Sequence, residues 1–212
     1  MSAGTPDRET RPRIQSAEQL DQLDFSKGDG LLPVIAQHAL TGEVLMLAYA
    51  NRDALVRTLA DRVMCYFSRS RGELWRKGDT SGNLQHLVSL HADCDGDTVI
   101  ARVLPHGPAC HTGASNCFDT MPTLPALDSV ILSRIATPTD SSYTQTLLAD
   151  DNLRLKKLGE EAVELALACE RGESDRVAEE AADLLYHVLV ACRAANVSLA
   201  QVLAVLEARA AP

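Results

Sequence analysis

The sequence predicts an α+β protein in which a β-rich N-terminal domain precedes an all-α C-terminal domain. Ten of the twelve glycines, all three phenylalanines and the single tryptophan lie before residue 128. From residue 140 onward the chain has two glycines, and residues that favour helices dominate. Short apolar segments between turn residues are typical of strands, and long glycine-poor segments are typical of helices. The two parts are therefore expected to fold differently.

The N-terminal part contains short segments with the composition and alternation of strands. Strands are expected over residues 31–36, 44–49, 65–68, 84–91 and 98–104. Thr41 and Gly42 form the expected turn between the first two strands. Residues 51–59 are expected to form a helix, with Asn51 as its N-cap.

The C-terminal part is expected to form a helical bundle. Helices are expected over residues 127–136, 150–170, 174–195 and 199–209. Gly172 is the expected stop of the second helix, and Ser174 and Ser198 are the expected caps of the next two. Two prolines in residues 119–125 mark the boundary, which gives domains of residues 1–122 and 126–212.

Composition and charge argue against several classes of protein. The apolar and charged fractions are those of a soluble globular protein, and the net charge of −9 argues against binding to nucleic acid or to an anionic membrane. The sequence has no apolar core of a signal peptide in residues 1–15 and no apolar run that could span a bilayer. We therefore expect a cytoplasmic protein, whose six cysteines are reduced thiols available for metal binding or catalysis.

Two pairs of acidic residues lie in the predicted helices of the C-terminal part. Glu161 and Glu164 form one pair, and Glu180 and Asp183 form the other. Residues three apart share a helix face, where like charges repel by roughly 0.2–0.5 kcal/mol per pair. A Mg²⁺ ion, which favours carboxylates together with substrate phosphates, would remove this repulsion. The spacing alone is equally compatible with magnesium-dependent phosphate chemistry and with two solvated acidic faces.

A cluster of aspartates surrounds a cysteine in the N-terminal part. Asp93, Asp95 and Asp97 alternate with other residues around Cys94. If this segment were a strand, the aspartates would face one side and the cysteine the other. Two adjacent metal sites could then form, one with hard oxygen ligands and one with soft sulfur ligands.

Three cysteines are candidates for the sulfur site, namely Cys94, Cys110 and Cys117. Three thiolates suit Zn²⁺ and leave a fourth position for a water, whose pKa the metal would lower to about 7. His111 follows Cys110 directly and is a candidate general acid or base. The alternative is that Cys94 and Cys117 are small buried residues and that the aspartates lie in a turn.

Three ordered motifs in the first part resemble the phosphoribosyl-AMP cyclohydrolase family. They cover residues 74–83, 93–97 and 107–118 and read LWRKGDTSGN, DCDGD and GPACHTGASNCF. Residues 155–164 and 180–187, which read LKKLGEEAVE and EAADLLYH, resemble phosphoribosyl-ATP diphosphatase, an all-α MazG-like pyrophosphohydrolase. The order of the motifs is similar to that of the fused bifunctional enzyme of histidine biosynthesis.

This resemblance implies two consecutive reactions on small-molecule substrates. The C-terminal domain would hydrolyse N1-(5-phosphoribosyl)-ATP to phosphoribosyl-AMP and pyrophosphate, and the N-terminal domain would then open the purine ring between N1 and C6. It also implies an intertwined homodimer in which two subunits share the zinc and magnesium sites of the N-terminal domain. Neither nucleic acid nor membrane is an implied partner.

The resemblance further implies a role for particular residues of each domain. The implied zinc ligands are Cys94, Cys110 and Cys117. The implied magnesium ligands are Asp93, Asp95 and Asp97 in the first domain, and Glu160, Glu161, Glu164, Glu180 and Asp183 in the second. The implied catalytic residues are His111, Glu161 and Glu164. The implied substrate contacts are Trp75, Arg76, Lys77, Ser81, Asn83 and Lys157.

Several of these residues also have a plain structural interpretation. Trp75 is equally expected in the core, Arg76 and Lys77 are common types of exposed residue, and Lys157 can belong to a surface ion pair. His187 is expected to be a packed histidine and not a ligand.

The chain departs from the family pattern at two positions. Asp79 stands where the family usually has glutamate, and Asn116 stands where it usually has serine. Both residues remain polar, so the departures bear on the positioning of the substrate and not on the metal ligands.

Two other functions remain open at this point. One is a MazG-type nucleotide pyrophosphatase with a structural zinc domain, and the other is a non-catalytic, zinc-stabilised dimerisation module attached to a helical bundle. Neither of these readings requires the conspicuous segment of residues 75–83.

Overall fold

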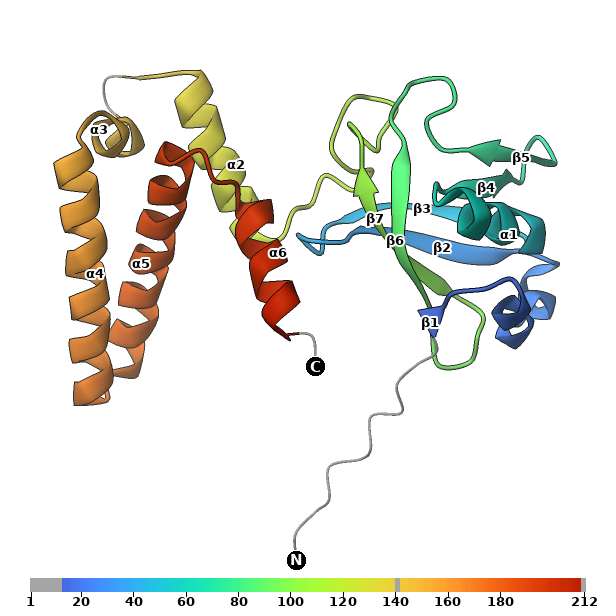
Figure 1. Cartoon of the computed structure of the whole chain (residues 1–212), viewed down its shortest axis with the longest axis horizontal. Helices are drawn as coiled ribbons and strands as arrows, with labels where there is room; N and C mark the ends of the chain where they lie inside the picture. The colour runs from blue at the N-terminus through green and yellow to red at the C-terminus, as the bar shows by residue number, and fades with distance from the viewer. Residues whose placement is uncertain (1–12, 140–141, 211–212) are drawn as a thin grey trace, which may run out of the picture. The chain divides into compact units, whose positions relative to one another are not determined.

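The computed structural model describes residues 13–139 and 142–210. The chain divides into two compact units, Met1–Met121 and Pro122–Pro212. The described strands lie in the first unit, and the second unit is built from helices (Figure 1). The predicted α+β class and the order of its two parts are therefore confirmed.

Over residues 13–121 the first unit contains seven strands, one α-helix and two short 3-10 helices. The strands are β1 (Arg13–Ile14), β2 (Leu32–His38), β3 (Val44–Ala50), β4 (Cys65–Ser68), β5 (Glu73–Arg76), β6 (Gln85–Ala92) and β7 (Val99–Pro105). Helix α1 spans Arg52–Asp61, and the 3-10 helices span Glu18–Gln22 and Phe25–Gly28. All five predicted strands are confirmed to within two residues at each end, whereas β1 and β5 were not predicted.

The strands form one sheet in the order β1-β6-β7-β2-β3-β4-β5. Strands β2 and β7 are parallel, and the other neighbours are antiparallel. The sheet curls, because Val63, just before β4, forms a bridge with His86 in β6, although β4 and β6 are not neighbours in this order. The curled sheet encloses a core with the fully buried Tyr66, whose hydroxyl donates to Gln85 Oε1 at 2.8 Å.

Helix α1 has the predicted N-cap. The side chain of Asn51 accepts a hydrogen bond from the backbone N–H of Ala54 at 2.9 Å, which satisfies one of the free donors of the first turn. At the other end Arg62 takes the left-handed conformation and ends the helix.

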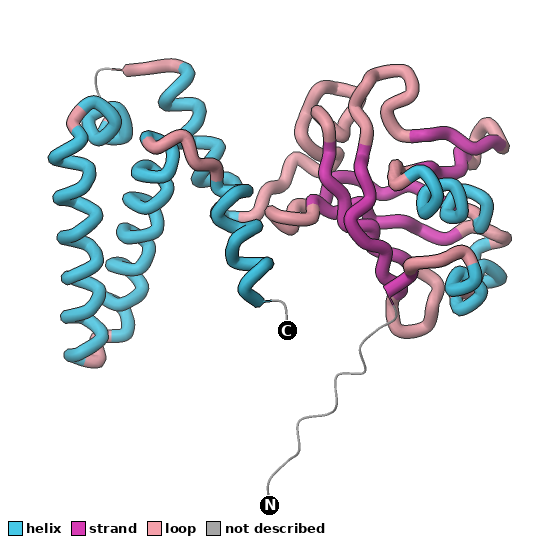
Figure 2. The backbone as a smooth tube through the Cα atoms, in the orientation of Figure 1, coloured by secondary structure: helices cyan, strands magenta, loops and turns pink. Residues whose placement is uncertain are grey.

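Within its described residues, 122–139 and 142–210, the second unit contains five helices, shown in cyan in Figure 2. They are α2 (Thr123–Ala136), α3 (Tyr143–Ala149), α4 (Asp151–Arg171), α5 (Ser174–Ala194) and α6 (Leu199–Ala210). The four predicted helices are confirmed, and α3 was not predicted.

Two of the three predicted helix signals of this unit are confirmed. Gly172, with φ of 69°, ends α4 and donates to carbonyls of its last turn. The Ser198 hydroxyl accepts from the backbone N–H of Gln201 at the start of α6. Ser174 is not the cap of α5 but its first residue, and no side chain caps this helix.

Helices α4 and α5 pack side by side over most of their length (Figure 1). The buried core of the unit is small and consists of Ile131, Leu147, Leu189, Val190 and Leu199. Large apolar side chains remain exposed on α4 and α5, among them Leu155, Val163, Leu167 and Leu185. No single helix of residues 13–139 and 142–210 is long and apolar enough to cross a membrane, although the bent pair of α5 and α6 would pass on length and composition alone.

A mostly buried ion pair joins α2 to α5. Arg193 donates from Nε to Asp128 Oδ1 at 2.7 Å, and its Nη2 contacts the second oxygen of the same carboxylate. Because the core of this unit is small, this two-point contact is expected to contribute substantially to its stability.

Removing one partner of this pair should destabilise the second unit. We expect Asp128→Ala to lower the free energy of unfolding of that unit by about 3 kcal/mol, because the guanidinium would be left without its counter-ion. Denaturant unfolding followed by circular dichroism at helical wavelengths checks this. The control is Glu179→Ala, which breaks the exposed pair with Arg176 and should have little effect. Equal effects of the two substitutions would contradict the prediction.

Candidate metal sites

The three aspartates of the first unit gather on the loop between β6 and β7. Carboxylate oxygens of Asp93, Asp95 and Asp97 lie within 4.8 Å of one another. The segment is a loop, as the alternative interpretation expected, so the alternation of faces that a strand would give does not apply. Gly96 sets the turn, because its φ is +74° and an added Cβ would lie 2.8 Å from the backbone oxygen of Gln22.

A lysine that is distant in sequence neutralises this loop. Lys27 Nζ lies 2.6 Å from Asp95 Oδ2 and 3.1 Å from Asp97 Oδ2. Its hydrogen bond lowers the pKa of the Asp95 carboxyl, and the two aspartates raise the pKa of Lys27. No local sequence pattern predicts this contact, because Lys27 and Asp95 are 68 positions apart. The ammonium group of Lys27 thus lies beside the carboxylates that would otherwise attract a metal cation.

The second cysteine segment forms a tight loop after β7. Cys110 donates its backbone N–H to the carbonyl of Ala114, and Cys117 donates its own to the carbonyl of Leu45. The Thr112 hydroxyl donates to Cys110 Sγ at 3.1 Å, which lowers the pKa of that thiol. Burial raises the pKa of Cys117, and the neighbouring Cys110 acts in the same direction. Each of the two thiols thus affects the pKa of the other.

Within one chain, Cys94 is separated from these two thiols. Strands β6 and β7 pair from Ala92–Val99 at one end to Gln85–Pro105 at the other. Cys94 follows the first end, and Cys110 follows the second. A strand of this length spans about 20 Å, so one chain does not bring the three cysteines together. Within a single chain the aspartates therefore gather, whereas a site with all three cysteines does not form beside them.

The segment that contains the predicted substrate contacts lies beside the cysteine loop. Lys77 Nζ donates to the carbonyl of Ala109 at 2.9 Å. The side chain of Asn83 packs so closely on Gly107 that a Cβ there would collide with it. Ser81 is exposed and its hydroxyl accepts from the backbone N–H of Asn83. Lys77, Ser81 and Asn83 therefore belong to loops that border Cys110.

Trp75 and Arg76 lie in β5, just before this segment. The Trp75 ring is half-buried and packs on Tyr66, with 5.0 Å between ring centroids, so it contributes to the core. Arg76 is exposed and pairs with Asp79 at 3.4 Å. His111 is also exposed, and its Nδ1 lies 3.8 Å from Cys110 Sγ.

In the second unit, α4 and α5 bring three glutamates together. Oxygens of Glu161, Glu164 and Glu180 lie within 4.8 Å of one another. Glu161 and Glu180 are buried, with 8% and 3% exposure, whereas Glu164 is exposed. Burial raises the pKa of Glu180, and Arg176, which contacts it, acts in the opposite direction. Buried carboxylates that face each other are costly without a cation, so the donor set fits a hard divalent ion.

The other two predicted ligands of this unit lie outside that group. Glu160 pairs with Lys156 and Lys157 at 3.2 and 2.9 Å. Asp183 is exposed on α5. Lys157 also lies 3.8 Å from Glu161, which places an ammonium group beside the acidic cluster.

His187, which the sequence analysis set aside as a packed residue, borders the glutamates. Its Nε2 lies 3.8 Å from Glu161 Oε1, and its Nδ1 is buried without a hydrogen-bond partner. Burial lowers the pKa of His187, and the neighbouring Glu161 acts in the opposite direction. The sequence indicates this proximity through the spacing of seven residues between Glu180 and His187, which places both side chains on nearby faces of one helix.

Removing the ammonium group from the aspartate loop should strengthen binding of a divalent cation. We expect Lys27→Met to tighten binding of Mn²⁺ at this loop by about three- to five-fold, because an exposed ion pair no longer competes. Paramagnetic broadening of the amide resonances of residues 93–97 measures this binding separately from the second unit. Arg52→Met, which breaks the exposed pair with Asp21, is the control. Unchanged or weaker binding in Lys27→Met would contradict the prediction.

Comparisons with known proteins match both units. The phosphoribosyl-AMP cyclohydrolase family profile matches residues 46–119, and the phosphoribosyl-ATP pyrophosphohydrolase profile matches residues 124–210. Histidine biosynthesis bifunctional protein HisIE of Xylella fastidiosa (strain Temecula1) is 47% identical over 193 residues, which cover 90% of this chain and 94% of that protein. The proteins of the same name from Deinococcus radiodurans and Escherichia coli K12 are 46% and 43% identical, over 90% and 91% of this chain and 93% and 97% of theirs. The chain therefore belongs to the family of bifunctional histidine-biosynthesis proteins, with a cyclohydrolase domain followed by a pyrophosphohydrolase domain.

Proposed function

We propose that the two units catalyse consecutive hydrolyses of one nucleotide. The second unit releases pyrophosphate from N1-(5-phosphoribosyl)-ATP, and the first unit opens the purine ring of the resulting phosphoribosyl-AMP between N1 and C6. The observation that carries this proposal is that each unit gathers its own set of metal-ligating side chains within a matched family domain. The substrates are small molecules, and the six free thiols suit the reducing cytoplasm, where we propose that the enzyme acts.

In the second unit, the glutamates of α4 and α5 provide the reaction centre. Glu161, Glu164 and Glu180 would hold Mg²⁺, which neutralises charge on the phosphates. The exposed Glu164 has the freedom to orient a water for attack on the α-phosphorus, and pyrophosphate leaves as the bond to the β-phosphate breaks. Lys157, beside Glu161, is placed to contact a phosphate oxygen. Glu160 and Asp183 would serve as outer ligands or as partners of the lysines and waters.

In the first unit, the cysteine loop and the neighbouring loop provide the reaction centre. Cys110 and Cys117 would hold Zn²⁺ together with Cys94 of a second copy of the chain. The ion, when bound, would supply a hydroxide near neutral pH. The hydroxide oxygen would add to C6 and become the carboxamide oxygen of the product. The N1–C6 bond would then break, and N1 would take up a proton. His111, next to Cys110, is the group placed to carry that proton.

The remaining residues of this unit would bind the substrate. Lys77, Ser81 and Asn83 border the cysteine loop and would contact the nucleotide, together with Trp75 and Arg76 of the adjoining strand β5. The aspartate loop would hold Mg²⁺, because Mg²⁺, unlike Zn²⁺, prefers oxygen ligands. With a metal on Asp93, Asp95 and Asp97, the ammonium of Lys27 would be released from these carboxylates.

We propose that the protein acts as a homodimer. The separation of Cys94 from Cys110 and Cys117 along β6 and β7 leaves each chain with an incomplete set of thiols. A second copy related by two-fold symmetry can supply the missing thiol to each site. The exposed apolar side chains of α4 and α5 support a further contact between copies in the second unit.

A nucleotide pyrophosphatase with a merely structural zinc domain is the alternative. It would use the same glutamates, so the second unit does not separate the two functions. The first unit does, because the loop with Lys77 and Asn83 packs against the cysteine loop, where a structural zinc module has no need of it.

The direct test is a coupled assay on the purified full-length protein. With phosphoribosyl-ATP, Mg²⁺ and Zn²⁺, we expect pyrophosphate release together with the ultraviolet change of ring opening. Glu164→Ala should lower the rate of pyrophosphate release by at least about 100-fold. Cys110→Ser should lower only the rate of ring opening, by at least about 100-fold. Pyrophosphate release without ring opening in the zinc-loaded wild type would refute the proposal for the first unit and favour the alternative.

A further inference from the structure

A buried carboxylate connects the β2–β3 hairpin to the cysteine loop. Glu43, immediately before β3, is only 6% exposed. Its Oε1 accepts hydrogen bonds from Ser115 Oγ at 2.9 Å and from Asn116 Nδ2 at 2.6 Å. A carboxylate is rarely buried unless its hydrogen bonds are made, and such charge-assisted bonds are strong and directional. Glu43 therefore holds two consecutive residues of the loop at fixed positions.

Asn116 extends this connection to both sides of Cys117. Its Nδ2 also donates to the carbonyl of Thr120 at 2.8 Å, and its Oδ1 accepts from the backbone N–H of Phe118 at 2.7 Å. The backbone N–H of Cys117 donates to the carbonyl of Leu45 at 2.8 Å. The residue before Cys117 is thus tied to residues that follow it, and the thiol lies within this hydrogen-bonded turn.

Ser115 extends the connection to the other thiol. The backbone N–H of Ala109 donates to the carbonyl of Ser115 at 3.1 Å, next to the bond from Cys110 to Ala114. Glu43 thereby fixes one side of the loop whose other side carries Cys110. The chain of hydrogen bonds from Glu43 thus reaches the backbone beside both cysteines, although Glu43 contacts neither thiol.

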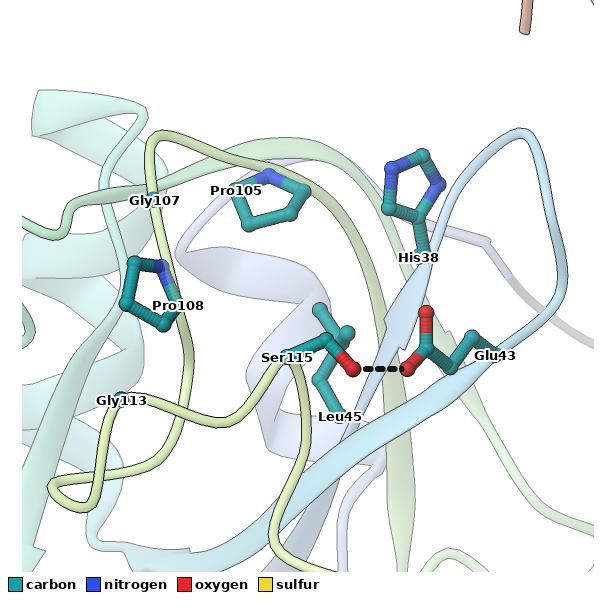
Figure 3. A pocket seen from close by; sticks show the side chains of 8 residues that line it. All are labelled: His38, Glu43, Leu45, Pro105, Gly107, Pro108, Gly113 and Ser115. Atoms are coloured by element: carbon teal, nitrogen blue, oxygen red, sulfur yellow. Dashed lines mark hydrogen bonds between the residues drawn. The ribbon is translucent and has the colours of Figure 1, made fainter. Parts of the chain in front are cut away.

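A hollow of about 300 Å³ lies between Glu43 and the cysteine loop, so few packed side chains support the loop there. Figure 3 shows Glu43 and Ser115 joined on one side of the hollow, with Pro108 and Gly113 of the loop across it. Over this region the loop does not rest on close-packed side chains. Its position relative to β3 is instead fixed by hydrogen bonds, which are directional.

We propose that Glu43 is a positioning residue for the thiolate site, because its hydrogen bonds hold the loop that carries Cys110 and Cys117 in place relative to β3. This inference rests on the zinc site of the proposed function. Residues that orient metal ligands without binding the metal commonly affect metal affinity, so Glu43 is expected to act through Asn116 and Ser115. Asn116, one of the two departures from the family pattern, is then part of the support and not a defect.

The test uses Co²⁺ as a probe for the thiolate site in the full-length dimer. Thiolate-to-Co²⁺ charge-transfer absorption arises only where sulfur binds the ion, so the carboxylate sites of both units do not contribute. We expect Glu43→Ala to weaken Co²⁺ binding by at least about ten-fold and to reduce this absorption. Glu43→Gln, which keeps the accepting oxygen, should recover part of the affinity, and pyrophosphate release by the second unit should be unchanged.

A matched control separates positioning from general stability. Thr58 is buried in the same unit, and its hydroxyl bonds to the backbone of Cys65 at 2.8 and 3.2 Å, away from the loop. Thr58→Val should lower the melting temperature without weakening Co²⁺ binding. If Glu43→Ala does not fold, Ser115→Ala removes one of the two bonds at an exposed residue and should still weaken binding several-fold.

The outcomes distinguish this inference from the proposed zinc site. A wild type without thiolate charge-transfer absorption would overturn both the zinc site and the role of Glu43. A wild type with this absorption, and Glu43 and Ser115 variants of unchanged affinity, would overturn only the role of Glu43. An equal loss in Thr58→Val at the same loss of melting temperature would also overturn it, because general destabilisation would then explain the effect.

Discussion

The paired strands β6 and β7 impose the main constraint on the first unit. Hydrogen bonds between the strands hold the hairpin extended, so the loops at its two ends cannot approach each other. One end carries the three aspartates and Cys94, and the other carries Cys110 and Cys117. A thiolate site with all three cysteines therefore requires two copies of the chain, which makes the proposed assembly a condition of catalysis.

In the second unit, by contrast, a single chain brings the candidate metal ligands together. Helices α4 and α5 pack side by side, and a spacing of three residues places Glu161 and Glu164 on one helix face opposite Glu180. Two of these carboxylates are buried, so a bound cation would be expected to stabilise the arrangement. Arg176 and Lys157 provide partial balance from the same helices.

The sequence was informative where the structure depends on local spacing. The helix period predicted that Glu161 and Glu164 share one helix face, and the cap of Asn51 and the stop at Gly172 follow from local hydrogen bonding. It was less informative where distant segments meet. The pairing of Lys27 with Asp95, and of Glu43 with Asn116, depends on how the sheet curls, which no local pattern encodes. Strand β5 and helix α3 were missed because they are short, and short elements take their conformation from their neighbours.

The most direct test of the account is complementation between two defective chains. Cys94→Ser and Cys110→Ser should each abolish ring opening when expressed alone, with pyrophosphate release retained. Co-expressed chains should recover about a quarter of the wild-type ring opening, because random pairing gives about half mixed dimers, each with one intact site. If mixed dimers form but remain as inactive in ring opening as either parent, the thiolate site is not shared between subunits and the account is contradicted.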